Sequence, residues 1–484
     1  PAALVPEAIL LAGAVVTLLT GMFVVKSRQW LAWLVALAAA GGSTVAAGVA
    51  AGTHRLLYED SYAIDLATTG ARLIVGAATV LLLVLARGRV GSAARETEFY
   101  VLILLASAGT VVLAGASDLL LLAVGYLLAS IPLYALAGWA RDAGGAEATL
   151  KTYLLGALMS ITMLAGIVVL TGTSGGATTY RALAAGLPHA PHVAVAFGVV
   201  AVLGGLAFKI GAVPAHFWVP DAVSGATIPA AAYLTTVPKI GGLLAAFRLF
   251  SAIPNDAVDW RLLVAVLAAA SMSLGNLAAF TQQSVKRLLA YSTISQVGYL
   301  MMAVAAAGRS GAALPALLTY LAAYTVSNVG AFAVLAALPN RPLLSDWRGA
   351  ARKHPGLVAV LVVCLLGLVG IPPTAVFFGK LTVFTATWDS GLVWLVVIAA
   401  LNTVASLYYY LRWLAPAVLP AVTSPEPTRG EAITVAADGA TPPAGIPPSL
   451  RWPTVTAYFC GFAATGVGLV GLAFFGDTVV ALMR

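Results

Sequence analysis

The feature that most constrains this chain is a succession of apolar stretches about 20 residues long, each long enough to cross a bilayer as an α-helix. Charged residues make up only 9% of the 484 residues, whereas soluble domains carry roughly 25%. The chain therefore has too little polar surface to cover a water-facing fold. These features exclude a soluble enzyme, a nucleic-acid-binding protein and a disulfide-rich secreted domain. They predict an all-α polytopic membrane protein.

Fourteen apolar spans can be assigned. They run at about 4–25, 30–51, 64–86, 98–116, 118–140, 149–171, 193–213, 228–250, 261–281, 287–307, 313–338, 357–386, 391–414 and 454–482. Cytoplasmic connections of membrane proteins are enriched in Lys and Arg. If the N-terminus lies outside, fifteen of the 26 basic residues fall on the cytoplasmic side, six on the outer side and five within spans. We therefore expect both termini outside, on the periplasmic side of the inner membrane if the cell is bacterial.

One connection is much longer than the others. Residues 415–453 are rich in Pro, Ala and Thr and have few large apolar residues, which predicts a flexible cytoplasmic loop. This loop separates the last span, within 454–484, from the other thirteen, so we expect that helix to be free to pack against a neighbouring subunit. The two cysteines, Cys364 and Cys460, lack the spacing of a metal site, and no metal ligand set is expected.

The N-terminal end of the sequence shows no sign of a targeting peptide. No basic segment precedes the first apolar stretch, and no small-residue cleavage site follows it. The sequence begins at Pro1 without an initiator Met, so we expect that a few preceding residues are missing from it.

Basic residues inside the spans are the strongest functional signal, because an ionisable group in the bilayer costs about 2.5–3.5 kcal/mol on insertion scales. Arg72 lies in the outer third of its span, where snorkelling or a pair with Asp65 would satisfy it. Lys151 follows Glu147 by four residues, which places the two on one helix face as an ion pair. Three further lysines have no acidic neighbour in the sequence: Lys209, Lys239 and Lys380.

Helix-interrupting residues lie beside each of these three lysines. Proline removes a backbone donor, and an opened helix is tolerated at membrane depth only where protein or water satisfies the freed groups. A lysine beside such a break is suited to bind and release a proton. The predicted helix breaks are at Gly211 and Pro214, at Pro238, and at Gly370, Pro372 and Pro373.

The two strongest breaks fall in the seventh and twelfth spans, five spans apart, so the units that contain them have opposite orientations. Paired Gly/Pro-interrupted spans are typical of inverted-repeat transporters. We therefore predict two inverted five-helix repeats, spans 4–8 and 9–13, with broken helices 7 and 12. The expected division is 1–97 for the first three helices, 98–251 and 261–414 for the repeats, 415–453 for the loop and 454–484 for helix 14.

Three segments resemble a known family: FKIGAVPAHFWVPDAVSGATIPAAAYLTTVPKIGG (208–242), QQSVKRLLAYSTISQVGYLMM (282–302) and GIPPTAVFFGKLTVF (370–384). They are similar to the antiporter-like subunits of proton-pumping NADH–quinone oxidoreductase, respiratory complex I. The similarity covers about residues 4–482. Among these subunits, TTVPKIGG resembles the form found in subunit N, and fourteen spans fit N and M but not L.

The resemblance implies a proton path across the midplane of the membrane. It would run through Lys209, Lys239 and Lys380, with Glu147 and Lys151 matching the segment that opens the sixth helix. Redox energy would come from quinone chemistry elsewhere in the complex, so FMN, iron–sulfur clusters and quinone are expected in partner subunits and no cofactor in this chain. The expected partners are the other membrane subunits of the complex, especially the neighbouring antiporter-like and small ones, with no nucleic acid.

One position departs from the family pattern. The fifth helix of the family reads approximately LELLSLPLY, with a glutamate that pairs the lysine of the seventh helix. The corresponding stretch here is YLLASIPLY (126–134), which places Leu127 in the glutamate column. Asp118 lies nine residues earlier in the same span, too far along the helix to replace that carboxylate directly. It is either a water-linked member of the path or an N-cap of the span.

Three functions are compatible with the sequence. The first is a proton-translocating subunit of complex I. The second is an M-like or Mrp-type cation/proton antiporter subunit. The third is a structural subunit of the membrane arm that has lost pumping, which the missing glutamate favours and the retained lysines oppose.

Overall fold

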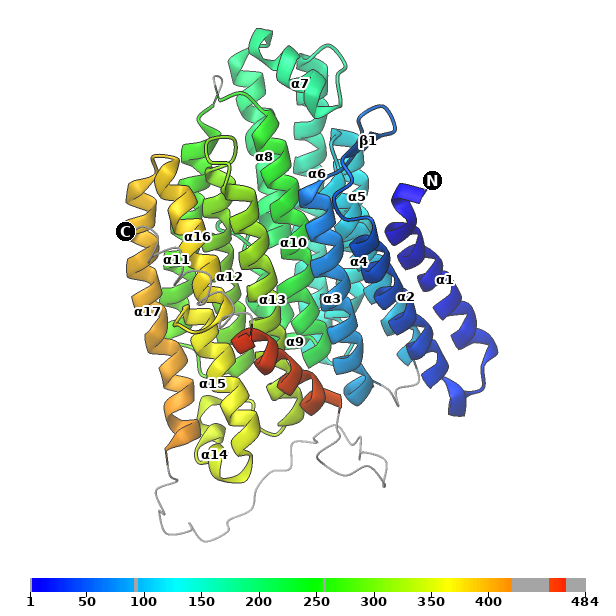
Figure 1. Ribbon diagram of the computed structural model, residues 1–484, viewed down its shortest axis with the longest axis vertical. Helices are drawn as coiled ribbons and strands as arrows, with labels where there is room; N and C mark the ends of the chain where they lie inside the picture. Colours follow the sequence, from blue (N-terminus) through cyan, green and yellow to red (C-terminus); the bar gives the residue numbers. More distant parts are fainter. Residues whose placement is uncertain (1, 91–94, 256–257, 420–451, 467–484) are drawn as a thin grey trace.

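Long helices aligned with one common direction dominate the computed structural model, which describes residues 2–90, 95–255, 258–419 and 452–466 (Figure 1). Within these ranges, twelve helices are long and apolar enough to cross a membrane. They are α1 (Val5–Phe23), α2 (Trp30–Val49), α3 (Leu66–Val90), α4 (Glu96–Gly115), α5 (Leu119–Ala137), α6 (Ala143–Thr173), α8 (His192–Ile210), α10 (Ile228–Ala252), α11 (Trp260–Phe280), α12 (Val285–Ala305), α13 (Ala313–Ala337) and α17 (Val393–Val418).

Shorter elements complete the chain. The strands β1 (Arg55–Leu57) and β2 (Tyr62–Ile64) form an antiparallel hairpin between α2 and α3. Single turns of 3-10 helix occur at Ala2–Leu4, Lys26–Arg28, Leu187–His189 and Leu344–Trp347. The remaining helices are α7 (Tyr180–Gly186), α9 (Trp218–Gly225), α14 (Ala350–Lys353), α15 (Pro355–Val369) and α16 (Ala375–Asp389).

Two of the crossings are broken helices, as the sequence predicts. The seventh consists of α8 and α9, and the twelfth of α15 and α16. With α15 and α16 taken as one crossing, the described parts of the chain contain thirteen crossings, with α9 counted as part of the seventh. The fourteenth predicted span, 454–482, lies partly outside the described residues and remains a prediction. The boundaries assigned to the repeats and to the loop remain predictions, and residues 420–451 of that loop lie outside the described residues.

The two breaks have the same local structure. Gly211 and Gly370 each adopt a left-handed conformation, with φ of 78° and 90°, directly after α8 and α15. The next residue in each case, Ala212 or Ile371, donates its backbone N–H five residues back, which is the Schellman pattern that ends helices. A proline in a cis peptide bond follows three residues after each glycine, at Pro214 and Pro373. The shared G-x-x-P sequence therefore produces two equivalent interruptions.

The third predicted break is wrong. Helix α10 continues through Pro238 without interruption. Proline cannot donate to the carbonyl four residues earlier, which here belongs to Leu234. The helix persists because another donor, described below, satisfies that carbonyl.

Close helix packing depends on small residues at corresponding places in the two halves. A Cβ atom at Gly109 of α4 would lie 2.4 Å from the backbone nitrogen of Ala129 in α5. A Cβ atom at Gly275 of α11 would lie 2.6 Å from the backbone nitrogen of Ser295 in α12. Such contacts let backbones approach closely where no hydrophobic force drives helices together in lipid. Helices α4 and α5 in the first half and α11 and α12 in the second half therefore form similar tight pairs.

Charged pairs join α1 to α3 and the start of α3 to α10. Arg72 is 1% exposed and binds Glu7 of α1, with Nε–Oε1 2.7 Å and Nη2–Oε2 2.9 Å. The alternatives of snorkelling or a pair with Asp65 are therefore wrong for Arg72. Asp65 instead pairs with Arg248 of α10 at 2.6 Å. Burial alone would raise the pKa of Asp65, but the hydrogen bonds and charge of Arg248 outweigh it and lower that pKa.

The helix at 452–466 packs against its own chain, and its packing against a neighbouring subunit remains a prediction. Trp452 contacts Trp33 of α2, with ring centroids 5.3 Å apart. Farther along, Cys460 and Cys364 of α15 both lie against Gly330 of α13. This helix therefore crosses from the first helices to the second half of the bundle.

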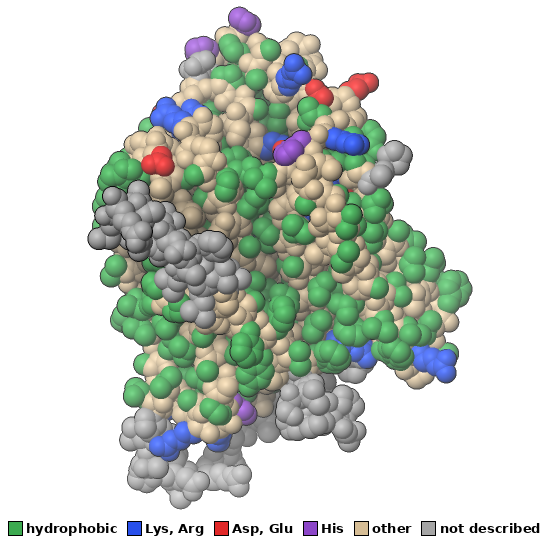
Figure 2. All heavy atoms as spheres, viewed as in Figure 1, with side chains coloured by type: hydrophobic (Ala, Val, Ile, Leu, Met, Phe, Trp, Pro, Cys, Tyr) green, Lys and Arg blue, Asp and Glu red, His purple; other side chains and the backbone are tan. Residues whose placement is uncertain are grey.

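The surface is consistent with a membrane-embedded bundle. On the face in Figure 2, Lys, Arg, Asp and Glu side chains gather toward the two ends, and a broad hydrophobic band separates them. Exposed leucine, isoleucine and valine side chains of α6, such as Leu158, Ile161 and Val168, belong to this apolar exterior.

The Glu7–Arg72 pair yields a stability prediction. Glu7→Ala should lower the free energy of unfolding of the detergent-solubilised chain by about 3–5 kcal/mol, because it leaves the guanidinium of Arg72 buried without its carboxylate. Replacing both residues, in Glu7→Gln/Arg72→Met, should cost less than Glu7→Ala alone, since no uncompensated charge remains. Equilibrium unfolding of the three proteins measures this, and equal losses in the single and double variants would contradict it.

Candidate functional site

Lys239 lies in α10 at the middle of the bundle and is fully buried. Its Nζ donates to the carbonyl oxygen of Leu234 at 2.7 Å. This is the carbonyl that Pro238 leaves without a helical N–H partner. The Nζ atom also lies 4.8 Å from the ring centroid of Trp218 in α9. The Pro-Lys sequence thus creates both a vacant acceptor and the donor that fills it.

Lys209 occupies the last turn of α8, two residues before the break at Gly211. Its Nζ donates to Ser130 Oγ at 2.5 Å and to the carbonyl of Tyr126 at 3.2 Å, both in α5. The ring centroid of Tyr126 lies 4.7 Å from Nζ. The side chain is 3% exposed, so α5 supplies its polar contacts.

Lys380 lies in α16 but reaches back to the end of α15. Its Nζ donates to the carbonyl of Val369 at 2.8 Å. Val369 is the last residue of α15, where helix carbonyls lack intrahelical partners and carry partial negative charge. The ring centroid of Tyr299 in α12 lies 4.0 Å from Nζ. The interruption of helix 12 therefore provides the acceptor for this lysine.

The three lysines share one kind of environment. Each is bound by a backbone carbonyl and lies over an aromatic ring, the geometry of a cation–π contact. Among the described residues, none of the three forms an ion pair with a carboxylate. Neutral acceptors stabilise an ammonium group less than a carboxylate does, so the balance between charged and neutral lysine is closer here than in an ion pair.

Neutral polar side chains connect Lys239 with the break in helix 12. Tyr324 of α13 donates to the carbonyl of Thr235 at 2.8 Å and to Thr293 Oγ1 at 3.1 Å. Tyr320, one turn earlier in α13, donates to Gln296 Oε1 at 2.5 Å. Gln296 in turn donates to the carbonyl of Leu368, the neighbour of the residue that binds Lys380. Hydroxyl and amide groups that both donate and accept thus run from α10 to α15.

A second charged group lies where α9 meets α6 and α12. Lys151 Nζ is 2.6 Å from Glu147 Oε1, which confirms the predicted ion pair. It is also 2.8 Å from Asp221 Oδ2 of α9, and Arg287 of α12 binds the other oxygen of Asp221 at 3.0 Å. All four side chains are at least a quarter exposed, so each pair contributes about 1 kcal/mol or less. Together they hold the short half of helix 7 between two long helices.

Asp221 was missed by the sequence analysis. It belongs to the PAHFWVPDA stretch that carries the family resemblance, and an acidic residue inside an apolar run was the signal that marks it. Ser130 and the three aromatic rings were also missed. Serine and aromatic residues are common in membrane helices, and only the fold brings these particular ones to the lysines.

Two further positions of the fifth helix can now be located. Asp118 is the N-cap of α5 and accepts from the backbone N–H groups of Leu120 at 2.7 Å and Leu121 at 3.1 Å. This is the capping role that the sequence analysis gave as one of its two alternatives. Leu127 follows Tyr126, whose carbonyl binds Lys209, and it is 38% exposed. Ser130 therefore provides the side-chain contact to Lys209.

Comparison with known proteins places this arrangement in a family. Residues 116–406 match the family described as NADH:quinone oxidoreductase/Mrp antiporter, TM. The chain belongs to this family. NADH-quinone oxidoreductase subunit N 1 of Streptomyces griseus is 53% identical over 445 residues, which cover 90% of this chain and 94% of the relative. NADH-quinone oxidoreductase subunit N of Mycobacterium sp. is 50% identical over 418 residues, 86% and 89% of the two chains. This antiporter-like chain is therefore of the subunit N type.

Solved structures agree with this assignment. A chain of respiratory complex I from Thermus thermophilus with bound Aureothin superposes with a TM-score of 0.79 at 31% identity, over 96% of this chain and 97% of that one. A chain of the Mrp complex from Dietzia sp. gives a TM-score of 0.81 at 22% identity, over 97% and 95% of the two chains. The Mrp likeness shows a shared antiporter-like fold alone.

The contact between Lys239 and Leu234 leads to a testable prediction. Pro238→Ala restores a backbone N–H that competes with Lys239 for the carbonyl of Leu234. Since a hydrogen bond to a charged group contributes about 1.5–3 kcal/mol, sharing that acceptor should slow proton pumping by up to about tenfold at neutral pH. Part of the loss should return at lower pH, where lysine binds a proton more readily. NADH-driven pumping in membrane vesicles, recorded across pH, measures the effect.

The matched control is Pro416→Ala, which changes the proline inside α17. It should leave the pH profile of pumping unchanged. If Pro238→Ala gives the same profile as this control, the carbonyl of Leu234 does not set the behaviour of Lys239.

Proposed function

We propose that this subunit translocates protons across the membrane through Lys209, Lys239 and Lys380, driven by quinone reduction elsewhere in the NADH–quinone oxidoreductase complex. The observation that carries the proposal is the environment of Lys239: a fully buried lysine at the centre of the bundle, held by one carbonyl and one ring. A charge buried only for stability would normally be paired, as Arg72 is with Glu7. An unpaired lysine at this depth is suited to alternate between charged and neutral forms.

The position of Lys239 next to Lys209 supports transfer between them. A Cβ atom at Gly211, directly after α8, would lie 3.8 Å from Lys239 Nζ. A Cβ atom at Gly242 of α10 would lie 3.4 Å from Lys209 Cγ. Lys239 thus lies beside the end of α8, and Lys209 lies beside α10. Two positive charges in this region repel in a medium of low dielectric constant, so arrival of a proton at one lysine favours its departure from the other.

The path onward to Lys380 would use the neutral side chains of α12 and α13. Within the described residues, Thr325 Oγ1, Ser327 Oγ and Asn328 Oδ1 of α13 are buried without a protein hydrogen-bond partner. Buried polar atoms of this kind normally bind water. Water at these positions would extend the relay of Tyr324, Thr293, Tyr320 and Gln296 toward the break in helix 12.

The broken helices have a direct role in this proposal. Gly211, Pro214, Gly370, Pro372 and Pro373 end regular hydrogen bonding beside Lys209 and Lys380, so carbonyls and dipoles become available within the membrane. Glu147, Lys151 and Asp118 are proposed as charged groups at the ends of the path. The repeats at 98–251 and 261–414 would then each contribute one broken helix.

The proposal assigns the redox chemistry to other subunits. FMN, iron–sulfur clusters and quinone would lie in partner subunits, and the neighbouring antiporter-like and small membrane subunits would be direct partners. The distribution of basic residues supports an inner-membrane location with both termini on the periplasmic side.

Replacement of Lys239 tests the function. Lys239→Ala should largely abolish the pumping that depends on this subunit, while the complex still assembles and transfers electrons from NADH to an artificial acceptor. Lys353→Ala, at an exposed position beside α15, is the matched control and should pump normally. Normal pumping by assembled Lys239→Ala would instead support a structural subunit of the membrane arm.

Cysteine labelling tests the orientation. A cysteine at Arg309, between α12 and α13, should react with a membrane-impermeant thiol reagent only from the periplasmic side. A cysteine at Ser345, between α13 and α14, should react only from the cytoplasmic side. The background is low, because Cys364 and Cys460 are both buried. The reverse pattern would overturn the orientation derived from the basic residues.

A further inference from the structure

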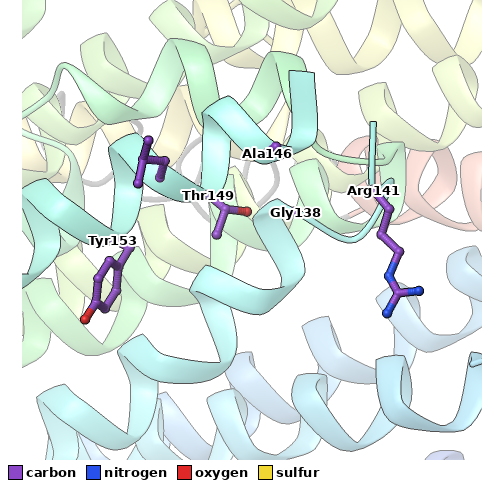
Figure 3. Close-up of a pocket in the computed structure, with 6 residues that line it drawn as sticks. Gly138, Arg141, Ala146, Thr149 and Tyr153 are labelled. Carbon is purple, nitrogen blue, oxygen red and sulfur yellow. The ribbon is translucent and has the colours of Figure 1, made fainter. Parts of the chain in front are cut away.

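An open pocket lies at the elbow between α5 and α6. It has a volume of about 440 Å³ and is lined by Gly138, Arg141, Ala146, Thr149, Leu150 and Tyr153. Figure 3 shows these residues around the turn that joins the two helices, with Thr149 and Tyr153 on successive turns of α6. The pocket is open to the surroundings of the protein.

A small enclosed cavity lies deeper in the same seam, next to Lys209. It measures about 10 Å³ and is lined by Ser130, Leu133, Tyr134, Thr152, Phe208, Lys209 and Trp218. This volume is at the lower limit for one water molecule, which needs roughly 10–15 Å³. On one side the cavity is closed by Phe208 and Trp218, whose ring centroids are 5.4 Å apart. Its hydroxyl-bearing residues, Ser130, Tyr134 and Thr152, belong to α5 and α6.

Tyr134 stands between the pocket and the cavity. Its ring packs edge-on against Tyr153 of the pocket, with centroids 5.8 Å apart, and its carbonyl accepts from Thr149 Oγ1 at 3.4 Å. The same residue lines the cavity of Lys209. Its hydroxyl lies against Gly156 of α6, where an added Cβ atom would be only 2.2 Å from the hydroxyl oxygen. A glycine at 156 therefore makes the room that this hydroxyl occupies.

Hydroxyl groups continue from Tyr134 to the lysine. Ser130, one turn earlier in α5, binds Lys209 directly at 2.5 Å. Thr152 and Ser160 line the facing side of α6 and are buried. A hydroxyl group both donates and accepts a hydrogen bond, so it relays a proton without holding a charge permanently. Ser130, Tyr134 and Thr152 thus place three hydroxyl groups around the cavity that holds Lys209.

We propose that protons reach Lys209 from the pocket at the α5–α6 elbow, and that the Tyr134 hydroxyl is the gate between this pocket and the lysine. The inference rests on the proposed translocation function and adds the route by which its first lysine is loaded. Tyr134 positions and relays the proton, and Ser130 passes it to Lys209. Rotation of one phenol ring between Tyr153 and the cavity would open or close the connection.

Removal of the hydroxyl tests the route in the assembled complex. Tyr134→Phe keeps the ring and should lose the same fraction of NADH-driven pumping as Lys209→Ala. The double variant should lose no more than either single variant, because both changes interrupt one path. Tyr134→His retains a group that exchanges protons, so it should recover pumping with a new dependence on pH near the ordinary pKa of histidine, about 6.5.

The matched control is Tyr408→Phe, which removes a hydroxyl from an exposed tyrosine of α17 outside this route and should pump normally. Normal pumping by Tyr134→Phe, together with loss in Lys209→Ala and Lys239→Ala, would overturn the route while leaving the proposed function intact. Normal pumping by assembled Lys239→Ala would instead overturn the function itself. A loss in Tyr134→Phe that Tyr134→His does not recover would show a purely structural role for Tyr134 and would also overturn the route.

Blocking the pocket gives an independent test. Thr149→Cys, treated with a small sulfonate-bearing methanethiosulfonate reagent, should lose pumping to the same extent as Tyr134→Phe. Leu158→Cys, at an exposed site farther along α6, is the control and should keep pumping after the same treatment. Unchanged pumping in fully labelled Thr149→Cys would show that protons do not enter through this pocket.

Discussion

The interaction on which the rest of this structure depends is the hydrogen bond between a buried lysine and a backbone carbonyl that has lost its helical partner. A lysine at membrane depth needs an oxygen acceptor, and a regular helix offers none because its carbonyls are already bonded. Pro238 frees the carbonyl of Leu234 for Lys239, and the end of α15 frees that of Val369 for Lys380. Lys239 and Lys380 therefore depend on irregularities in the helices, whereas Lys209 binds Ser130 and a carbonyl within α5.

This mutual requirement connects architecture with function. Buried pairs such as Glu7–Arg72 and Asp65–Arg248 tie helices together with full charges and have little freedom to exchange protons. Among the residues that the structure describes, the partners of the three midplane lysines are carbonyls, a hydroxyl and aromatic rings. The chain thus separates two uses of buried charge. Ion pairs join α1 to α3 and the start of α3 to α10, and lysines without carboxylate partners among the described residues occupy the centre, where transport would take place.

The residue at position 127 bears on how Lys209 is held. The family resemblance implies a glutamate there as counter-ion for Lys209. In this chain Ser130, one turn away, supplies the side-chain contact instead. A hydroxyl stabilises an ammonium group less than a carboxylate does, so Lys209 is held in the same way as the other two lysines. In a path of similar sites, the first lysine does not bind its proton more tightly than the others. This suits a group that must release each proton it binds.

The sequence by itself determined the series of membrane-crossing helices, the two broken helices and the three lysines, because the cost of charge and of unpaired backbone in a bilayer restricts where such residues occur. The G-x-x-P segments at Gly211 and Gly370 predicted breaks for this reason, and the spacing of Glu147 and Lys151 predicted their pair. Only the tertiary structure decided which groups meet across the bundle: Arg72 binds Glu7 rather than Asp65, Asp221 joins Lys151 to Arg287, and Pro238 leaves α10 continuous. These contacts join residues tens of positions apart or depend on a donor from a side chain. Local pattern carries no information on them, since they arise from how whole helices pack.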